Sequence, residues 1–123
     1  MNTINRRAVE RFALPPMHTS VTVSHVEDGC LHHEQGHAYD VSEHGVRIEL
    51  DRALPPGEQV EVKLSLPGIV SQVRVNGNII WLGHQDDDPG PRRMAVCFTS
   101  WGSQADRDRL LDFLGGGGML RAA

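Results

Sequence analysis

The chain has 123 residues, of which 39% are apolar and 23% are charged. This length suits one small domain, and the composition excludes a fully disordered or collagen-like chain. A formal net charge of -4 at pH 7 argues against general binding to DNA or RNA. Because no stretch approaches the roughly 20 apolar residues of a membrane span and no signal peptide is recognisable, we expect a cytoplasmic protein without membrane insertion. Cys30 and Cys97 are too few for a disulfide framework, so we expect reduced thiols, with Cys97 in the core.

The basic residues are biased in type and in position. Of the 12, all but one are arginine, whose planar guanidinium grips a phosphate or a base edge through two hydrogen bonds. Arg6, Arg7 and Arg11 lie within the first 11 residues, opposed only by Glu10. Such a segment is either a solvated terminus or a cationic arm for a specific anionic ligand. We predict that residues 1–12 form a flexible basic arm.

Alternating apolar and polar residues predict a run of short strands separated by turns. Gly45–Leu50 is the clearest of them, with one dry face and one wet face. Asn76-Gly77 alone would favour a hairpin, but the unbroken alternation from Val70 to Trp81 favours one long strand with the glycine at a bend or bulge. The other predicted strands are 19–26, 60–66 and 93–98, whereas the segment 32–40 is ambiguous.

A helix is predicted after the last strand. Ser103 is a typical N-cap residue, and Asp106 follows three positions later as the acid of a capping-box-like pair. Leucines and Phe113 supply an apolar helical face, and the run of glycines that begins at position 115 ends the helix. We therefore predict five to seven strands in a small antiparallel barrel, one packed helix over 103–114 and a flexible Gly-rich tail over 115–123.

The segment 33–37 reads His-Glu-Gln-Gly-His and matches the His-Glu-x-x-His pattern of zinc peptidases. On a helix, His33 and His37 would share a face and bind zinc, with Glu34 as the general base. Turn-forming residues flank the motif closely on both sides, which leaves no room for a long helix. Our interpretation is a polar surface loop or a hairpin, and a small zinc metallopeptidase is kept as the alternative function.

Two further motifs are short but occur in a recognisable order. Arg7 and Arg11 are four residues apart, and Asp40, Ser42 and Gly45 form an Asp-x-Ser-x-x-Gly pattern before a predicted strand. Taken alone, the second pattern is typical of an Asx or Ser turn. In this order, and about 30 residues apart, the two resemble the Arg-x-x-x-Arg arm and the Asp/Asn-x-Ser-x-x-Gly motif of the PilZ family of cyclic di-GMP receptors. Segments 54–57, 77–81 and 95–98 resemble further family segments, so that the resemblance covers residues 5–114.

The resemblance implies a six-stranded antiparallel β-barrel within residues 13–114, which binds cyclic di-GMP without catalysis. Arg7 and Arg11 would hold phosphate oxygens and the O6/N7 edge of guanine, and Arg6 would add a phosphate contact. Asp40 would accept hydrogen bonds from guanine N1–H and N2–H2. Ser42 and the backbone at Gly45 would complete the edge contacts.

The resemblance also implies a role in signalling. The protein would be a receptor or adaptor that relays the second messenger to an unidentified effector protein as its N-terminal arm becomes ordered. Control of motility, biofilm formation and exopolysaccharide is what the family suggests. We expect no catalytic residue, metal or cofactor, and either a monomer or a homodimer. An adaptor that has lost ligand binding is a third possibility, against which the retained arginines argue.

Overall fold

A computed structural model describes residues 12–14, 19–69, 71–81 and 92–117. Arg6, Arg7 and Arg11 lie outside the described residues, as do most of the predicted arm and the end of the predicted tail. Within the described ranges the elements are β1 (Phe12–Ala13), β2 (Ser20–Glu27), β3 (Cys30–Val41), β4 (Gly45–Leu50), β5 (Gln59–Leu64), β6 (Val73–Trp81), β7 (Arg92–Trp101), α2 (Gln104–Asp112) and a π-helical turn, η2 (Phe113–Gly117).

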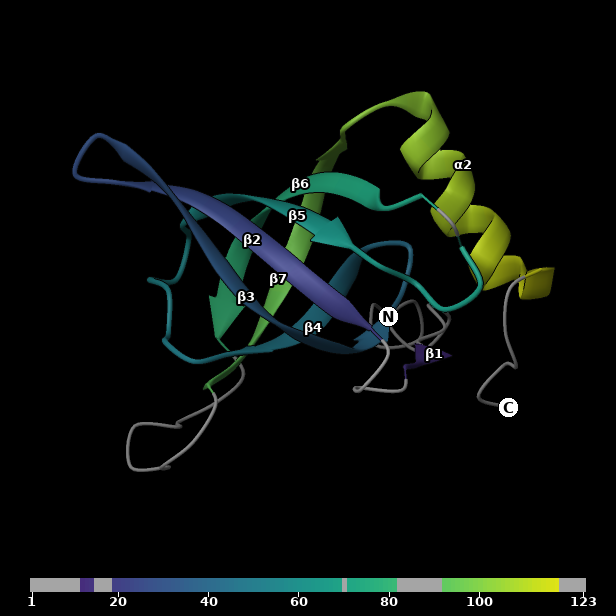
Figure 1. Ribbon diagram of the computed structural model, residues 1–123, viewed down its shortest axis with the longest axis horizontal. Helices are drawn as coiled ribbons and strands as arrows, with labels where there is room; N and C mark the ends of the chain where they lie inside the picture. Colours follow the sequence, from purple (N-terminus) through teal and green to yellow (C-terminus); the bar gives the residue numbers. More distant parts are fainter. Residues whose placement is uncertain (1–11, 15–18, 70, 82–91, 118–123) are drawn as a thin grey trace, which may run out of the picture.

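Six antiparallel strands close into a barrel (Figure 1). The order is β3-β2-β5-β6-β7-β4, and β4 pairs back with β3 to complete the ring. This confirms the predicted six-stranded barrel. The two-residue strand β1 lies along the end of β3, with Phe12 opposite Val41 and Ala13 opposite Asp40, whereas β2 pairs with the first part of β3. The N-terminal segment therefore joins the barrel beside Asp40.

Inward-facing Val, Leu and Ile residues fill the barrel. The two-residue period that predicted the strands places alternate side chains inside, as in β5, where Val60, Val62 and Leu64 are all buried. The same alternation corrects the prediction for Cys97. In β7 the buried residues are Met94 and Val96, so Cys97 faces outward and is exposed. An apolar sequence neighbourhood did not indicate which face the thiol would take.

Residue 77 is glycine because β6 and β7 approach each other closely there. One long strand is confirmed. The register of β6 with β7 shifts between Asn76 and Gly77, where Thr99 is the extra residue, so the bulge lies in β7 opposite the glycine and not in β6. A Cβ atom at position 77 would lie 2.4 Å from the backbone oxygen of Cys97. Any larger residue would force the two strands apart.

The C-terminal helix covers one end of the barrel (Figure 1). It packs on β6 and β7, and Leu110 and Phe113 join the barrel core. Ser103 caps it as predicted, with its Oγ accepting from the backbone N–H of Asp106. No helix in the described ranges has the length and apolar character needed to cross a bilayer.

Candidate functional site

A β-bulge brings Asp40 to the outer surface of the barrel. Ala38 is paired with Ile48 and Asp40 with Arg47, so Tyr39 is an extra residue in β3. Regular alternation would bury Asp40 together with Ala38. The bulge reverses the alternation, so that Val41 is buried and the Asp40 side chain is 16% exposed. The carboxylate therefore lies at the surface next to β1.

Ser42 and Gly45 shape the tight turn that follows. The backbone N–H of Ser42 donates to the Gly45 oxygen over 2.9 Å, and the Ser42 Oγ accepts from the His44 N–H over 3.2 Å. Ser42 itself is fully buried. The motif spans the end of β3, the turn and the start of β4, and the Ser42–His44 contact is the Ser turn before a strand that the pattern alone indicated.

Gly45 is required by the closure of the barrel. It is paired with Cys97, and a Cβ atom would lie 2.6 Å from the backbone oxygen of Val96. In this structure the close approach that glycine permits is thus made to β7. Asp40 is the motif residue with a side chain at the surface.

The outer face around Asp40 also carries three charged or aromatic residues that sequence reasoning did not include in the site. Arg47 Nη1 lies 3.5 Å from Asp40 Oδ2. The guanidinium of Arg93 lies 5.7 Å from the centre of the Tyr39 ring and also bonds Glu49 over 2.8 Å. Burial, together with the negative charge of Asp40, raises the pKa of Tyr39 above its ordinary value, so its hydroxyl stays protonated. The outward positions of Gly45–Leu50 could have indicated Arg47, but the bulge that places it opposite Asp40 has no clear sequence signal.

The His-Glu-x-x-His segment lies in β3, not on a helix. Four residues in a strand span about 13 Å, which is too far for His33 and His37 to share one zinc ion. His33 instead bonds Ser24 Oγ over 2.7 Å across the β2–β3 hairpin. Among the described residues there is no group of three metal-ligating side chains. The interpretation as part of a hairpin is confirmed, and the helical geometry of the peptidase alternative is wrong.

Replacing Gly45 with alanine is expected to lower the free energy of unfolding by about 1–3 kcal/mol, because Cβ would overlap the β7 backbone. Chemical denaturation would measure this loss. Gly115→Ala is the matched control, since a Cβ there meets nothing within 4 Å. Equal losses in both variants would contradict the proposed role of Gly45 in barrel closure.

Comparison with known proteins identifies the family of the chain. The PilZ domain family model matches residues 5–116, and the chain therefore belongs to the PilZ domain family. The solved structure of the PilZ domain with c-di-GMP (cyclic di-GMP) of YcgR from Escherichia coli is similar, with a TM-score of 0.61, 16% identity and 90% of each chain covered. The Bacillus subtilis inhibitor of motility, MotI/DgrA, gives a TM-score of 0.57 at 17% identity. That match covers 88% of this chain and 48% of the B. subtilis chain, so this chain spans about half the length of that one. Among curated protein sequences, none matches the chain.

Proposed function

We propose that this protein is a receptor for cyclic di-GMP, which it binds on the outer face of the barrel at the end of β3. The observation that carries the proposal is the partly exposed carboxylate of Asp40, which the bulge turns outward and which lies beside β1. Membership of the PilZ family supports this ligand, as does the c-di-GMP in the similar domain of YcgR.

Asp40 would select guanine. The Watson–Crick edge of guanine presents two adjacent donors, N1–H and N2–H2, and a carboxylate can accept from both. Adenine presents an acceptor at N1, which a carboxylate would repel. Ser42 is buried, so we assign it to holding the turn in place. The backbone at Gly45 would complete the contacts with the guanine edge.

Arginines would hold the phosphates. Arg6, Arg7 and Arg11 precede β1 in the sequence, and Ala13 of β1 is paired with Asp40, so these three arginines would reach a ligand bound at this edge of the barrel. Arg47 partly neutralises Asp40 from the other side, which reduces the repulsion between that carboxylate and an anionic ligand. Bidentate contacts to phosphate and to guanine O6/N7 suit these side chains.

Ordering of the N-terminal arm would carry the signal to an effector protein. Residues 1–11 contain three arginines and few apolar anchors, so contacts with a ligand carrying two phosphates would offset much of the entropy lost on ordering. An arm folded over the Asp40 face would change the surface that an effector meets. Motility is the pathway we propose first, because the similar B. subtilis protein is an inhibitor of motility.

Calorimetric titration of the purified chain tests the proposed function. We expect saturable binding of cyclic di-GMP and much weaker binding of GTP, cyclic GMP and cyclic di-AMP. The last of these keeps both phosphates and changes only the bases. No heat of binding with cyclic di-GMP would overturn the proposal.

Asp40→Ala is expected to reduce the preference for cyclic di-GMP over cyclic di-AMP by about 1–3 kcal/mol, because the guanine-specific acceptor is removed. The same titrations would measure it. Asp51→Ala, at an exposed position after β4, is the control and should keep the wild-type preference. An unchanged preference in Asp40→Ala would place guanine recognition elsewhere.

A further inference from the structure

Arg93, on β7, extends across β4 to the residue that precedes Asp40 in β3. Its guanidinium lies 5.7 Å from the centre of the Tyr39 ring, and its Nε donates to Glu49 of the intervening strand over 2.8 Å. These two contacts restrict the orientation of the guanidinium plane, yet the Arg93 side chain is 59% exposed. The structure therefore presents an oriented and accessible guanidinium on the same outer face as the Asp40 carboxylate.

The bulge in β3 brings these groups together. Regular alternation would place neighbouring residues on opposite faces, but with the extra residue both Tyr39 and Asp40 lie between the buried Ala38 and Val41 without entering the core. Burial raises the pKa of Tyr39 and the charge of Asp40 raises it further, whereas the charge of Arg93 acts in the opposite sense. Tyr39, Asp40 and Arg93 therefore form one cluster of interacting side chains.

An exposed guanidinium held over an aromatic ring suits a nucleobase. Arginine planes stack on bases, and stacking tolerates every base because each has a π-face. A carboxylate, in contrast, recognises the adjacent donors on the edge of guanine. The outer face therefore combines a position that selects guanine, at Asp40, with a position that accepts any base, at Arg93.

The spacing of the strands suits a ligand with two bases. Asp40 is opposite Arg47 on β4, and Arg93 is opposite Glu49, two residues further along that strand. The Cα atoms of Asp40 and Arg93 are therefore about 12 Å apart. The Arg93 side chain covers part of this distance, because it reaches back to the Tyr39 ring. A second base can thus stack on Arg93 while Asp40 holds the edge of the first.

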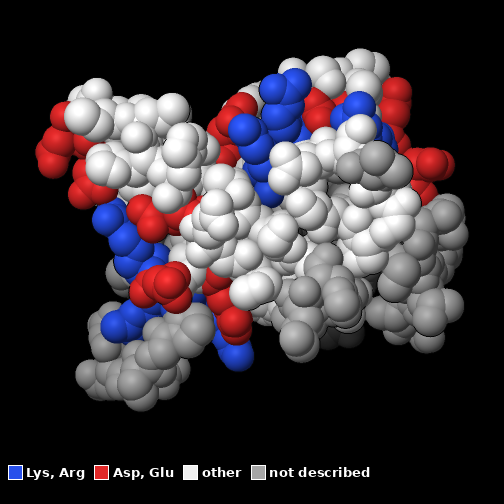
Figure 2. All heavy atoms as spheres, viewed as in Figure 1, with Lys and Arg blue, Asp and Glu red and all other residues white. Residues whose placement is uncertain are grey.

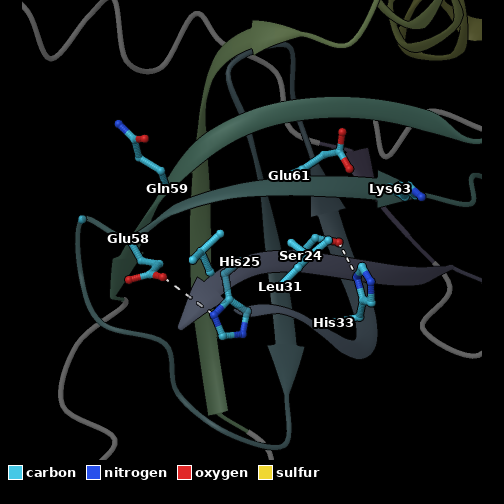
Figure 3. A pocket seen from close by; sticks show the side chains of 10 residues that line it. Ser24, His25, Leu31, His33, Glu58, Gln59, Glu61 and Lys63 are labelled. Atoms are coloured by element: carbon cyan, nitrogen blue, oxygen red, sulfur yellow. Dashed lines mark hydrogen bonds and ion pairs between the residues drawn. The ribbon is translucent and has the colours of Figure 1, made fainter. Parts of the chain in front are cut away.

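The groove at the other end of the barrel is too distant to take the second base. The β2–β3 hairpin projects from the end opposite to Asp40 (Figure 1) and stands apart from the body of the molecule (Figure 2). A groove of about 590 Å³ lies at its base, lined by Leu31, Glu61 and Lys63 among others (Figure 3). Leu31 and Asp40 are nine residues apart along β3, or about 30 Å, which a single cyclic dinucleotide does not span.

We propose that Arg93 stacks on the second base of the ligand and that this subsite does not select guanine. Tyr39 and Glu49 are positioning residues for the Arg93 guanidinium. The inference rests on the proposed binding of cyclic di-GMP at Asp40 and extends it to a further class of ligand, mixed cyclic dinucleotides with one guanine and one adenine.

Calorimetric titration with cyclic GMP–AMP of the same phosphate linkages tests this subsite without any substitution. We expect a dissociation constant within about threefold of that for cyclic di-GMP, because stacking tolerates adenine and one guanine instead of two costs only a statistical factor of about two. Cyclic di-AMP should bind at least about tenfold more weakly than the mixed ligand, because it offers no guanine to Asp40.

The outcomes separate the subsite from the proposed function. If cyclic di-GMP does not bind, the proposed function itself is overturned, and the subsite with it. If cyclic di-GMP binds but the mixed ligand binds as weakly as cyclic di-AMP, both bases are selected, and only the subsite is overturned.

Arg93→Ala should raise the dissociation constants of cyclic di-GMP and of the mixed ligand alike, by about 10-fold to 100-fold, the range for one lost base stack. Arg93→Lys keeps the charge but should lose most of the affinity too, because an ammonium has no plane to stack. Arg107→Ala, which removes an exposed arginine from α2, is the matched control and should bind as the wild type does. Wild-type affinity in Arg93→Ala would overturn the proposal.

Substitutions of Tyr39 test its positioning role. Tyr39→Phe keeps the ring and should keep the wild-type affinity, whereas Tyr39→Leu should weaken both ligands. In the Arg93→Ala background, Tyr39→Leu should change the affinity by less than about twofold, because a positioning residue acts only through the arginine. A full further loss in the double variant would overturn this role, and circular dichroism would check that each variant is folded.

Discussion

Replacing Arg11 with alanine is expected to weaken the binding of cyclic di-GMP by about 2–3 kcal/mol, the usual loss for a charge-assisted contact to a phosphate or a base edge. Arg11 directly precedes Phe12, which pairs with Val41, next to Asp40. We propose that the Arg11 guanidinium contacts a ligand held by Asp40, because the chain pairs with β3 one residue later. Calorimetry of the variant and of the wild type would measure the change. It corresponds to a dissociation constant about 30-fold to 150-fold higher.

Arg121→Ala is the control for this substitution. It removes the same charge from the C-terminal tail, and the affinity should stay at the wild-type value. If Arg11→Ala bound cyclic di-GMP as tightly as the wild type, the assignment of the basic segment to the ligand would be wrong.

Replacing Asp106 with alanine is expected to lower the free energy of unfolding by about 3 kcal/mol. Asp106 is 1% exposed, and its carboxylate ties the helix to β6 by accepting the backbone N–H of Arg74 over 2.9 Å. It also accepts from Ser103 Oγ over 2.7 Å and from Arg109 over 3.1 Å. Alanine leaves these donors without their acceptor. Chemical denaturation would measure the loss, and Asp108→Ala, exposed on the same helix, should change stability by less than about 0.5 kcal/mol.

The stabilisation of the fold by Asp106 should decrease as the pH falls. Burial by itself raises the pKa of Asp106, but the hydrogen bonds from Ser103 and the Arg74 backbone, with the charges of Arg74 and Arg109, outweigh it and lower the pKa below the ordinary value. The unfolded chain therefore binds this proton first as the pH falls. The stability gap between wild type and Asp106→Ala should be constant above about pH 5 and shrink below about pH 4. A gap that grows toward acid would contradict this account of the carboxylate.

Much of the fold could be predicted because its determinants are local. Alternation gives the face of each residue in β4, β5 and β6, and Ser103 gives the start of the helix. The glycine at position 77 indicated a bend or a bulge, and the register of β6 with β7 does shift there, although the extra residue is Thr99 of β7. These signals involve a residue and its immediate neighbours in the chain.

Features that depend on distant strands could not be predicted in the same way. The bulge at Tyr39 arises from how β3 pairs with β4, and it alone decides that Asp40 faces outward and Val41 inward. The polar segment 32–37 shows no alternation of apolar and polar residues, because much of β3 lies in a projecting ribbon with both faces in contact with solvent. Asp106 was predicted as the acid of a capping-box-like pair with Ser103, but its bond to Arg74 required knowledge of where the helix packs.

The sequence predicted which motif residues lie at the candidate site better than it predicted what each of them does there. The motif residues Asp40, Ser42 and Gly45 do lie together, at the turn between β3 and β4. Two of the three, however, serve the turn and the barrel closure in this structure, as the buried Ser42 and the contact of Gly45 with β7 show. A short motif records which residues are needed without distinguishing those that bind from those that hold the binding residue in place.

Amide hydrogen exchange with and without cyclic di-GMP tests the central claim most directly, because it reports where on the chain the ligand acts. We predict slower exchange at residues 38–46 and at residues 2–11 when the protein is saturated, with no change in β5 over 60–64 or in the hairpin over 26–31. Unchanged exchange at 38–46 in the saturated protein, or protection confined to the hairpin, would contradict a cyclic di-GMP site at the Asp40 end of the barrel.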